Sequence, residues 1–325
     1  MPATSRARPI LAAILLTMAV SAGCAGAVDQ EDLQKASGQL PGIEVSGRPG
    51  HPPKVRIRTP LAVEETHSRT VVPGTGGPLY LDRVFVLQLT MYDGRTGAKA
   101  VSTYDDDQTP LAVTDSASTL FPVLTKALVG LHQGSRLVMA ATAADTFGDA
   151  GAPQYGIEPG DPVVLVADVI AVPPQQVLSG PSGTSAASRD DLPRVLAGPD
   201  GTPRGVAFEA QGAQVPTPDH LVVVPLVDGD GPRVPARGLV TLDYLGQVWG
   251  SPGQFANTWL KEPETVPLGV DGVLPAWDEA LVGVRRGSRL LVVAPPDLAY
   301  GPTGNPPEIP GDATLVYVID VLGVS

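Results

Sequence analysis

The sequence predicts an α+β fold built from two copies of one unit, each with a short α-helix lying across one antiparallel β-sheet. Glycine and proline number 37 and 35 among the 325 residues, which favours many short strands joined by turns. Three blocks of sequence recur in the same order about 150 residues apart, which indicates a duplicated domain. Within each copy, strand-like alternation is interrupted by one stretch with helical spacing.

The duplication is visible in three pairs of segments. Residues 124–148 match residues 277–301 without a gap, and both contain Ala-Leu-Val-Gly followed by Gly-Ser-Arg-Leu. The apolar runs 163–172 and 315–324 correspond. A Gly-x-Gly turn followed by an apolar strand relates 71–89 to 225–245. We therefore expect one domain over 42–172 and a second over 205–325.

The elements of one unit follow in order along the chain. The stretches "RVFVLQLTMY" and "GLVTLDYLGQVW" alternate as half-buried strands do. In "PAWDEALVGV", apolar residues recur at helical spacing after Pro275, and Gly287 follows the expected end of the helix. The stretches "SRLLVVAPP" and "ATLVYVIDVLGV" return to strand. A helix lying across one antiparallel sheet is an α+β arrangement.

The N-terminus has the pattern of an export signal. Arg6 and Arg8 precede an apolar run over residues 10–20, which is too short to cross a membrane comfortably. The residues Ser-Ala-Gly-Cys that follow resemble the bacterial lipobox, in which Cys24 would carry the lipid. Cys24 is the only cysteine, so no disulfide competes for its thiol. A plain signal peptide cleaved nearby, or an ordinary apolar N-terminus, is the alternative.

The residues outside the two expected domains are predicted to form a leader and connecting segments. We expect a signal peptide over 1–23, a polar tether over 24–41 and a Pro-, Ser- and Gly-rich linker over 173–204. The mature protein would be extracytoplasmic and lipid-anchored in the cell envelope of a bacterium. The net charge of −12 argues against nucleic acid as a partner. The four histidines have no paired spacing, so we expect neither a metal nor a cofactor.

The second copy resembles the FKBP-type peptidyl-prolyl cis-trans isomerases. The resemblance rests on "LDYLG", on "GVLPAWDEALVGVRRGSRLLVVAPPDLAYGPTGNPPEIP" and on "ATLVYVIDVL", and it runs over about 235–324. It implies a concave sheet around a helix, with an apolar pocket that accepts a prolyl ring and its preceding residue.

The resemblance also implies which residues form this pocket. They are Trp277 at the floor, Tyr244, Phe255 and Tyr317 as aromatic walls, Tyr300 as a hydroxyl donor, Val273 and Leu274 as backbone contacts to ligand carbonyls, and Ile309 at the rim. Aromatic side chains are, in most proteins, simply core. The positions of Tyr244, Trp277 and Tyr317 nevertheless carry leucine in the first copy, where a pure core role would be expected to keep the rings.

Two departures from the family pattern bear on rate and on affinity for macrolide inhibitors. Ala256 follows Phe255 where the family usually has aspartate, and Asn257 could replace that carboxylate only partly. Glu264 falls where an apolar aromatic residue commonly lines the pocket edge. Neither departure affects the expected fold.

The first copy keeps the frame and loses most of the rings. Leu89, Leu124 and Leu165 stand where the second copy has Tyr244, Trp277 and Tyr317, and Phe147 keeps the ring of Tyr300 without its hydroxyl. Apolar exchanges of this kind preserve a core. We therefore expect a degenerate first domain.

The leading hypothesis is a prolyl isomerase that acts, through its second domain, on proline-containing segments of exported proteins. Such catalysis requires no cofactor, because a dry apolar site that favours the twisted amide is sufficient. The alternative is a non-catalytic surface chaperone or peptide-binding module on the same scaffold. A solute-binding lipoprotein would need two lobes that close on one site, which the tandem repeats with a linker disfavour.

Overall fold

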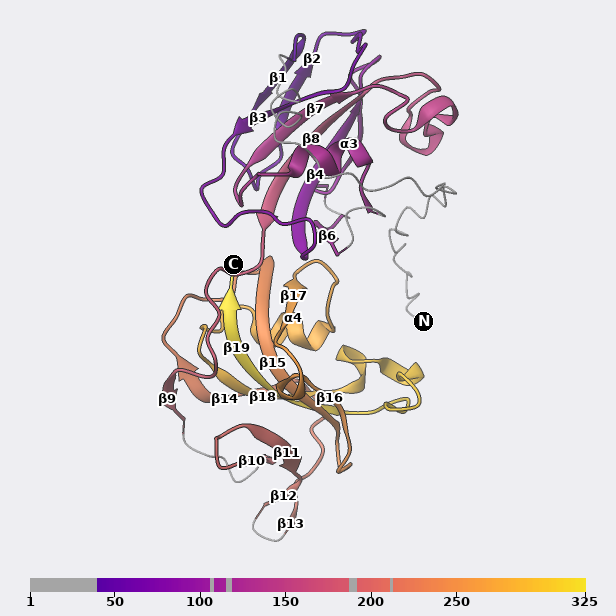
Figure 1. Ribbon diagram of the computed structural model, residues 1–325. Coiled ribbons are helices and arrows are strands. Elements are labelled where there is room, and N and C mark those ends of the chain that lie inside the picture. Colours follow the sequence, from indigo (N-terminus) through magenta and orange to yellow (C-terminus); the bar gives the residue numbers. More distant parts are fainter. Residues whose placement is uncertain (1–39, 106–107, 115–118, 187–191, 211–212) are drawn as a thin grey trace.

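The computed structural model describes residues 40–325 except 106–107, 115–118, 187–191 and 211–212 (Figure 1). The expected signal peptide over 1–23, Cys24 and nearly all of the tether over 24–41 lie outside the described residues.

The first sheet has the strand order β3-β7-β8-β4-β5, and β6 also pairs with β4. Every pairing in it is antiparallel. A short helix, α3 (Pro122–Leu128), packs against this sheet through Leu124 and Leu128. The strands are β3 (His67–Val72), β4 (Phe85–Asp93), β5 (Lys99–Ser102), β6 (Leu111–Val113), β7 (Arg136–Ala141) and β8 (Val163–Ala171).

The second sheet has the order β16-β15-β19-β18-β14-β9, and β17 also pairs with β15. Helix α4 (Pro275–Leu281) packs against it through Trp277, Ala280 and Leu281. The strands are β9 (Gly183–Ser185), β14 (Val222–Gly229), β15 (Gly238–Val248), β16 (Gln254–Asn257), β17 (Glu264–Leu268), β18 (Arg289–Ala294) and β19 (Leu315–Val324).

The two sheets share one topology. The first strand order becomes the second, apart from its additional edge strand β9, when β3, β7, β8, β4, β5 and β6 are replaced by β14, β18, β19, β15, β16 and β17. The same turn recurs too: the hydroxyl of Ser135 accepts a hydrogen bond from Gly74 N–H at 2.9 Å, and that of Ser288 accepts one from Gly229 N–H at 2.9 Å. The predicted α+β class is confirmed.

Helix α4 begins where the sequence predicts and ends earlier. Pro275 occupies the first turn, where a missing N–H costs nothing, and Leu274 precedes it in extended conformation. The helix ends at Leu281 instead of continuing past Val284, because Gly283 has a φ of 83°. Glycine adopts that left-handed conformation readily and terminates helices.

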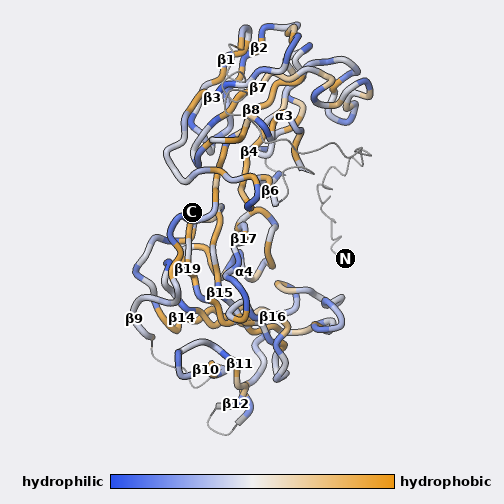
Figure 2. The backbone as a smooth tube through the Cα atoms, in the orientation of Figure 1, coloured by the Kyte–Doolittle hydropathy of each residue, from blue (hydrophilic) through white to orange (hydrophobic). Residues whose placement is uncertain are grey.

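The central strands are buried on both faces, which corrects the expectation of half-buried strands. A β-hairpin covers the outer face of each sheet: β1 (Ile43–Ser46) with β2 (Lys54–Ile57) in the first domain, and β10 (Arg194–Ala197) with β11 (Pro203–Ala207) in the second. Figure 2 shows apolar residues along the central strands and polar residues toward the outer loops. Sheets covered on both sides read as continuous apolar runs, not as alternation.

Part of the segment 173–204, assigned to a linker from its composition, lies in strands. β9 extends the edge of the second sheet by pairing with β14, and β10 belongs to the outer hairpin. The Leu178 N–H also donates to the carbonyl oxygen of Leu322 at 3.0 Å. This segment therefore packs along the second sheet as well as joining the two domains.

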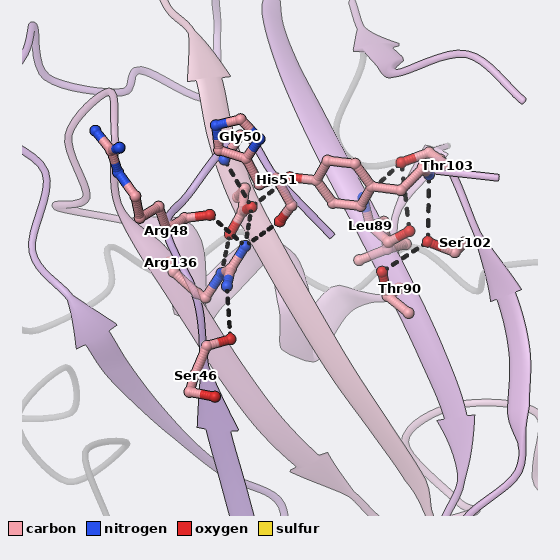
Figure 3. Close-up of polar contacts among 11 residues, drawn as sticks. Ser46, Arg48, Gly50, His51, Leu89, Thr90, Ser102, Thr103 and Arg136 are labelled. Carbon is pink, nitrogen blue, oxygen red and sulfur yellow. Dashed lines mark hydrogen bonds and ion pairs between the residues drawn. The ribbon is translucent and has the colours of Figure 1, made fainter. Parts of the chain in front are cut away.

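A buried ion pair joins two central strands of the first sheet to its hairpin (Figure 3). Arg136 on β7 donates to both carboxylate oxygens of Asp168 on β8, each at 2.6 Å, and both side chains are almost fully buried. The same guanidinium donates to the carbonyl oxygens of Ser46, Arg48 and His51 in the β1–β2 hairpin. The hairpin is therefore held by charge-assisted hydrogen bonds as well as by apolar contact.

The second sheet repeats this arrangement. Arg289 on β18 donates to Asp320 on β19 at 2.6 and 2.7 Å. It also donates to the carbonyl oxygen of Gly201, in the turn between β10 and β11, at 2.9 Å. Its guanidinium lies 5.8 Å from the centre of the Trp259 ring.

The two domains meet end to end through a small apolar cluster. Val86 on β4 and Ala171 on β8 pack against Leu239 on β15 and Val270, and all four are buried. Figure 1 shows the ends of β4 and β8 facing the end of β15. The contact removes the ends of both sheets from water.

Arg136→Met tests the buried pair. Removing the guanidinium leaves Asp168 buried without its countercharge, which should lower the free energy of unfolding by about 3–5 kcal/mol. Urea unfolding measures this value. Lys99→Met is the matched control, because Lys99 pairs with Asp105 while both side chains are more than two-fifths exposed. Exposed pairs contribute about 0–1 kcal/mol, so equal costs for the two variants would contradict the assignment.

Candidate active site

Helix α4 places the Trp277 indole between two strands of the second sheet. The ring lies edge-on to Tyr244 of β15, with centroids 4.8 Å apart at 82°, and to Tyr317 of β19, at 5.3 Å and 85°. Trp277 is buried. Edge-to-face packing is the favourable geometry for such pairs, so the three rings fix one another's orientation.

Phe255 extends this row of rings. It lies edge-on to Tyr317, with centroids 5.7 Å apart at 86°. Space for it is provided by Gly246, which lies opposite Tyr317 in the β15–β19 register. A Cβ atom at Gly246 would lie 2.6 Å from two ring carbons of Phe255. The row Tyr244–Trp277–Tyr317–Phe255 therefore requires glycine at this position of the strand.

The aliphatic residues predicted for the pocket lie against the same core. Ile309 is buried, and Val273 and Leu274 are partly buried beside it. Asn305 and Ile309 exchange backbone hydrogen bonds, at 2.8 and 3.1 Å, which hold the loop that carries Ile309. Among the described residues, the Leu274 N–H has no hydrogen-bond partner, so it remains available to a ligand carbonyl.

Tyr300 lies at the rim, apart from the row of rings. It precedes the short turn η5 (Gly301–Thr303), and its side chain is exposed. The hydroxyl of Tyr300 is near enough to Tyr244 and Tyr317 to contribute to raising the pKa of both, although burial is the larger cause in each case. The hydroxyl groups of Tyr244 and Tyr317 therefore stay protonated at neutral pH.

Of two polar groups in the site, the Tyr244 hydroxyl has a hydrogen-bond partner and the Trp277 indole N–H has none among the described residues. The Tyr244 hydroxyl donates to Glu264 Oε2 at 2.7 Å, and this bond also raises the Tyr244 pKa. The Trp277 Nε1–H is buried and has no partner among the described residues. Because a buried donor without a partner is costly, this N–H points to a missing acceptor.

Sequence reasoning identified the rings and missed what positions them. Thr258 accepts a hydrogen bond from the Tyr244 N–H at 2.7 Å and donates to Asp243 at 2.8 Å, which connects the segment after β16 to β15. Burial raises the pKa of Asp243. Gly246 could have indicated the close packing of a side chain on this strand, because glycine inside a strand often marks such a close approach.

The first domain fills the corresponding space with aliphatic side chains. Met91 faces Leu165 in the β4–β8 register, as Gly246 faces Tyr317 in the second domain. Met91 packs with Leu124 and Leu165 in one buried cluster. Phe147 packs edge-on to Phe121, with centroids 5.1 Å apart at 88°. A strand methionine in place of glycine therefore occupies room that the second domain gives to Phe255.

Comparison with known proteins identifies the second copy. Residues 231–322 match the family model described as FKBP-type peptidyl-prolyl cis-trans isomerase. FK506-binding protein 1 of Rhizopus delemar is 32% identical over 106 residues, which cover 98% of that protein and 32% of this chain. The chain belongs to the FKBP-type peptidyl-prolyl cis-trans isomerase family.

Further FKBP relatives match a similar length of this chain. A probable FK506-binding protein of Corynebacterium glutamicum is 30% identical over 107 residues, which cover 89% of it and 33% of this chain. The crystal structure of the three FKBP domains of wheat FKBP73 aligns with 79% of this chain and 94% of its own, at 16% identity and a TM-score of 0.33.

The described part of this FKBP-family chain has neither a membrane-spanning helix nor a cluster of metal-binding side chains. No helix there is long and apolar enough to cross a membrane. No three His, Cys, Asp or Glu side chains among the described residues lie together in a way that could hold a metal ion.

Gly246→Ala tests the close approach of Phe255 to the strand. The added methyl group would overlap the ring, so we expect Phe255 to move and stability to fall by about 1–3 kcal/mol. Shifted Phe255 ring resonances in NMR spectra and the unfolding midpoint report the two effects. Gly253→Ala is the control, because its Cβ would lie 3.6 Å from the nearest atom beyond its chain neighbours, Ser251 Oγ. Unchanged Phe255 resonances in Gly246→Ala would contradict the packing described.

Proposed function

We propose that the second domain catalyses cis-trans isomerisation of X–Pro bonds in exported polypeptides. The observation that carries the proposal is the row of four rings, one of which is an indole with a buried N–H that has no partner among the described residues. Membership of the isomerase family supports it. The first domain, whose equivalent space is filled by Met91, Leu124 and Leu165, would be inactive.

The chemistry fits an apolar site. Rotation about an X–Pro bond is slow because amide resonance must be lost, at a barrier of about 18–20 kcal/mol. The twisted amide has less charge on its oxygen than the planar forms, so removing it from water costs less. A dry pocket therefore binds the twisted form better than either planar form, and this difference lowers the barrier.

Each proposed contact has a defined task. The rings of Tyr244, Phe255, Trp277 and Tyr317 would grip the prolyl ring with little loss of side-chain entropy. The Leu274 N–H and the Tyr300 hydroxyl would hold carbonyl oxygens on either side of the bond. A second candidate, a non-catalytic peptide-binding module, is favoured by Glu264, because its bond to the Tyr244 hydroxyl places a carboxylate on a wall expected to be apolar.

The test uses the full chain and a short proline peptide, with isomerisation followed by NMR exchange. We expect acceleration by the wild type, a reduction of more than about tenfold for Trp277→Leu, which installs the first domain's residue, and about two- to tenfold for Tyr300→Phe, from loss of one hydrogen bond. Phe147→Leu is the matched first-domain variant and should retain the rate. No acceleration, with aggregation of a proline-free client suppressed, would favour the binding module.

We further propose that Cys24 carries a lipid anchor that holds the protein outside the cytoplasm. The support is the sequence Ser-Ala-Gly-Cys after two arginines and a short apolar run. We expect Cys24→Ser to abolish lipid attachment, seen as loss of the acyl mass from the N-terminal peptide, and to release the protein from membranes. An acylated Cys24→Ser protein would contradict the proposal.

A further inference from the structure

Strand β17 places a carboxylate on the wall of the candidate prolyl pocket. Glu264 is the first residue of β17 and lies opposite Leu242 of β15, two positions before Tyr244. Its side chain is exposed, and Oε2 accepts the Tyr244 hydroxyl at 2.7 Å. A carboxylate offers about four acceptor positions in all. Glu264 therefore keeps most of its acceptor capacity while one bond holds it against the aromatic wall.

Two stretches of chain that carry residues of the site are acidic. From residue 262 to 284, and again from 290 to 325, there is no lysine or arginine. These two stretches carry nine acids: Glu262, Glu264, Asp271, Asp278, Glu279, Asp297, Glu308, Asp312 and Asp320. Of these nine, only Asp320 forms an ion pair with a described residue.

The nearby basic residues are directed elsewhere. Arg289 is taken by Asp320 and by the outer hairpin. Arg285 donates to the carbonyl oxygen of Gly231 at 3.1 Å, beyond the end of α4. Lys261 precedes β17 and forms no ion pair within the described residues. Glu264 therefore forms no ion pair with a described residue.

A separate observation points to a ligand at the same group of rings. The Trp277 Nε1–H is buried, lacks a described partner, and belongs to a ring in edge contact with Tyr244. An occupant that supplies an acceptor there would be a peptide carbonyl or another uncharged acceptor. An occupant beside Glu264 would gain from a positive charge. One peptide segment can supply both groups if a basic residue lies near its proline.

We propose that Glu264 makes the second domain selective for X–Pro segments with a lysine or arginine near the proline. This inference rests on the proposed isomerase function and names its substrate class. Glu264 is a specificity-determining residue that contacts the substrate's flanking side chain. Because the pair would be partly exposed, the preference is modest, about threefold to fivefold at low salt. It decreases as salt screens the interaction over a Debye length of about 8–10 Å.

The experiment compares peptides that differ only in one flanking charge. Lysine, glutamine and glutamate are placed in turn two residues before, one before and one after the proline, and kcat/KM is measured by NMR exchange at low and high ionic strength. We expect the lysine peptide to exceed the glutamate peptide at one or more positions by about threefold or more. The ratio should approach one at high salt and in Glu264→Gln.

Glu209→Gln is the matched control. Glu209 lies on β12 (Glu209–Ala210), is exposed and loses the same charge, and the β12–β13 (Ala213–Gln214) hairpin lies away from α4 in Figure 1. It should retain the lysine preference. Equal kcat/KM values for lysine and glutamate peptides, or a preference unchanged by Glu264→Gln, would overturn the inference and leave the isomerase proposal standing.

Failure of catalysis is distinguishable from failure of selectivity. If no peptide is isomerised, the proposed function fails, and tryptophan fluorescence titrations of the same peptides then decide the selectivity by their Kd values. Tighter binding of lysine peptides that is lost in Glu264→Gln would support the same selectivity in a protein that binds peptides without isomerising them. Equal Kd values for lysine and glutamate peptides would overturn it.

Discussion

One cross-strand ion pair, present in each domain, fixes how the rest of the molecule is assembled. Arg136–Asp168 and Arg289–Asp320 connect the two central strands of their sheets and use the remaining guanidinium hydrogens on an outer hairpin. Removing one partner from a buried pair is far more costly than leaving the pair intact. The pair therefore holds two neighbouring strands in register and, at the same time, holds the hairpin on the outer face of the sheet. With that face closed, the inner face alone is left to receive the helix and a ligand.

On this common frame the two domains differ in the volume of a few inner side chains. The second combines a glycine on β15 with large rings on α4 and β19, whereas the first combines a methionine on β4 with leucines at the matching positions. Both solutions fill space at the sheet, since interiors are close-packed in either case. In the second, the Trp277 indole N–H has no partner among the described residues. Loss of the ring set thus preserves the fold while removing the groups that would contact a ligand.

The sequence predicted the duplication, the α+β class and the start of α4, because long matched segments and a Pro-initiated helical pattern are local signals. Through the resemblance of residues 235–324 it also indicated the four rings that pack in a row, whereas the fifth predicted aromatic residue, Tyr300, lies apart from them. It did not predict burial on both faces of the sheets, since alternation assumes a solvent-exposed face and the covering strand β10 lies in a segment whose composition suggested a linker. The Tyr244–Glu264 bond depends on the register between β15 and β17, which no local pattern specifies.

The separation of an apolar floor from a charged wall is what makes selectivity compatible with this chemistry. A charge buried among the rings would carry a large desolvation cost and would bind water in the very place where dryness favours the twisted amide. An exposed carboxylate such as Glu264 carries little of that cost, and its hydrogen bond to Tyr244 keeps it from swinging away into solvent. In the proposed isomerase, the prolyl ring and the flanking side chain would be recognised by different physical means at adjacent positions. The floor would determine whether the bond can twist, and the wall would determine which segments remain bound long enough for it to do so.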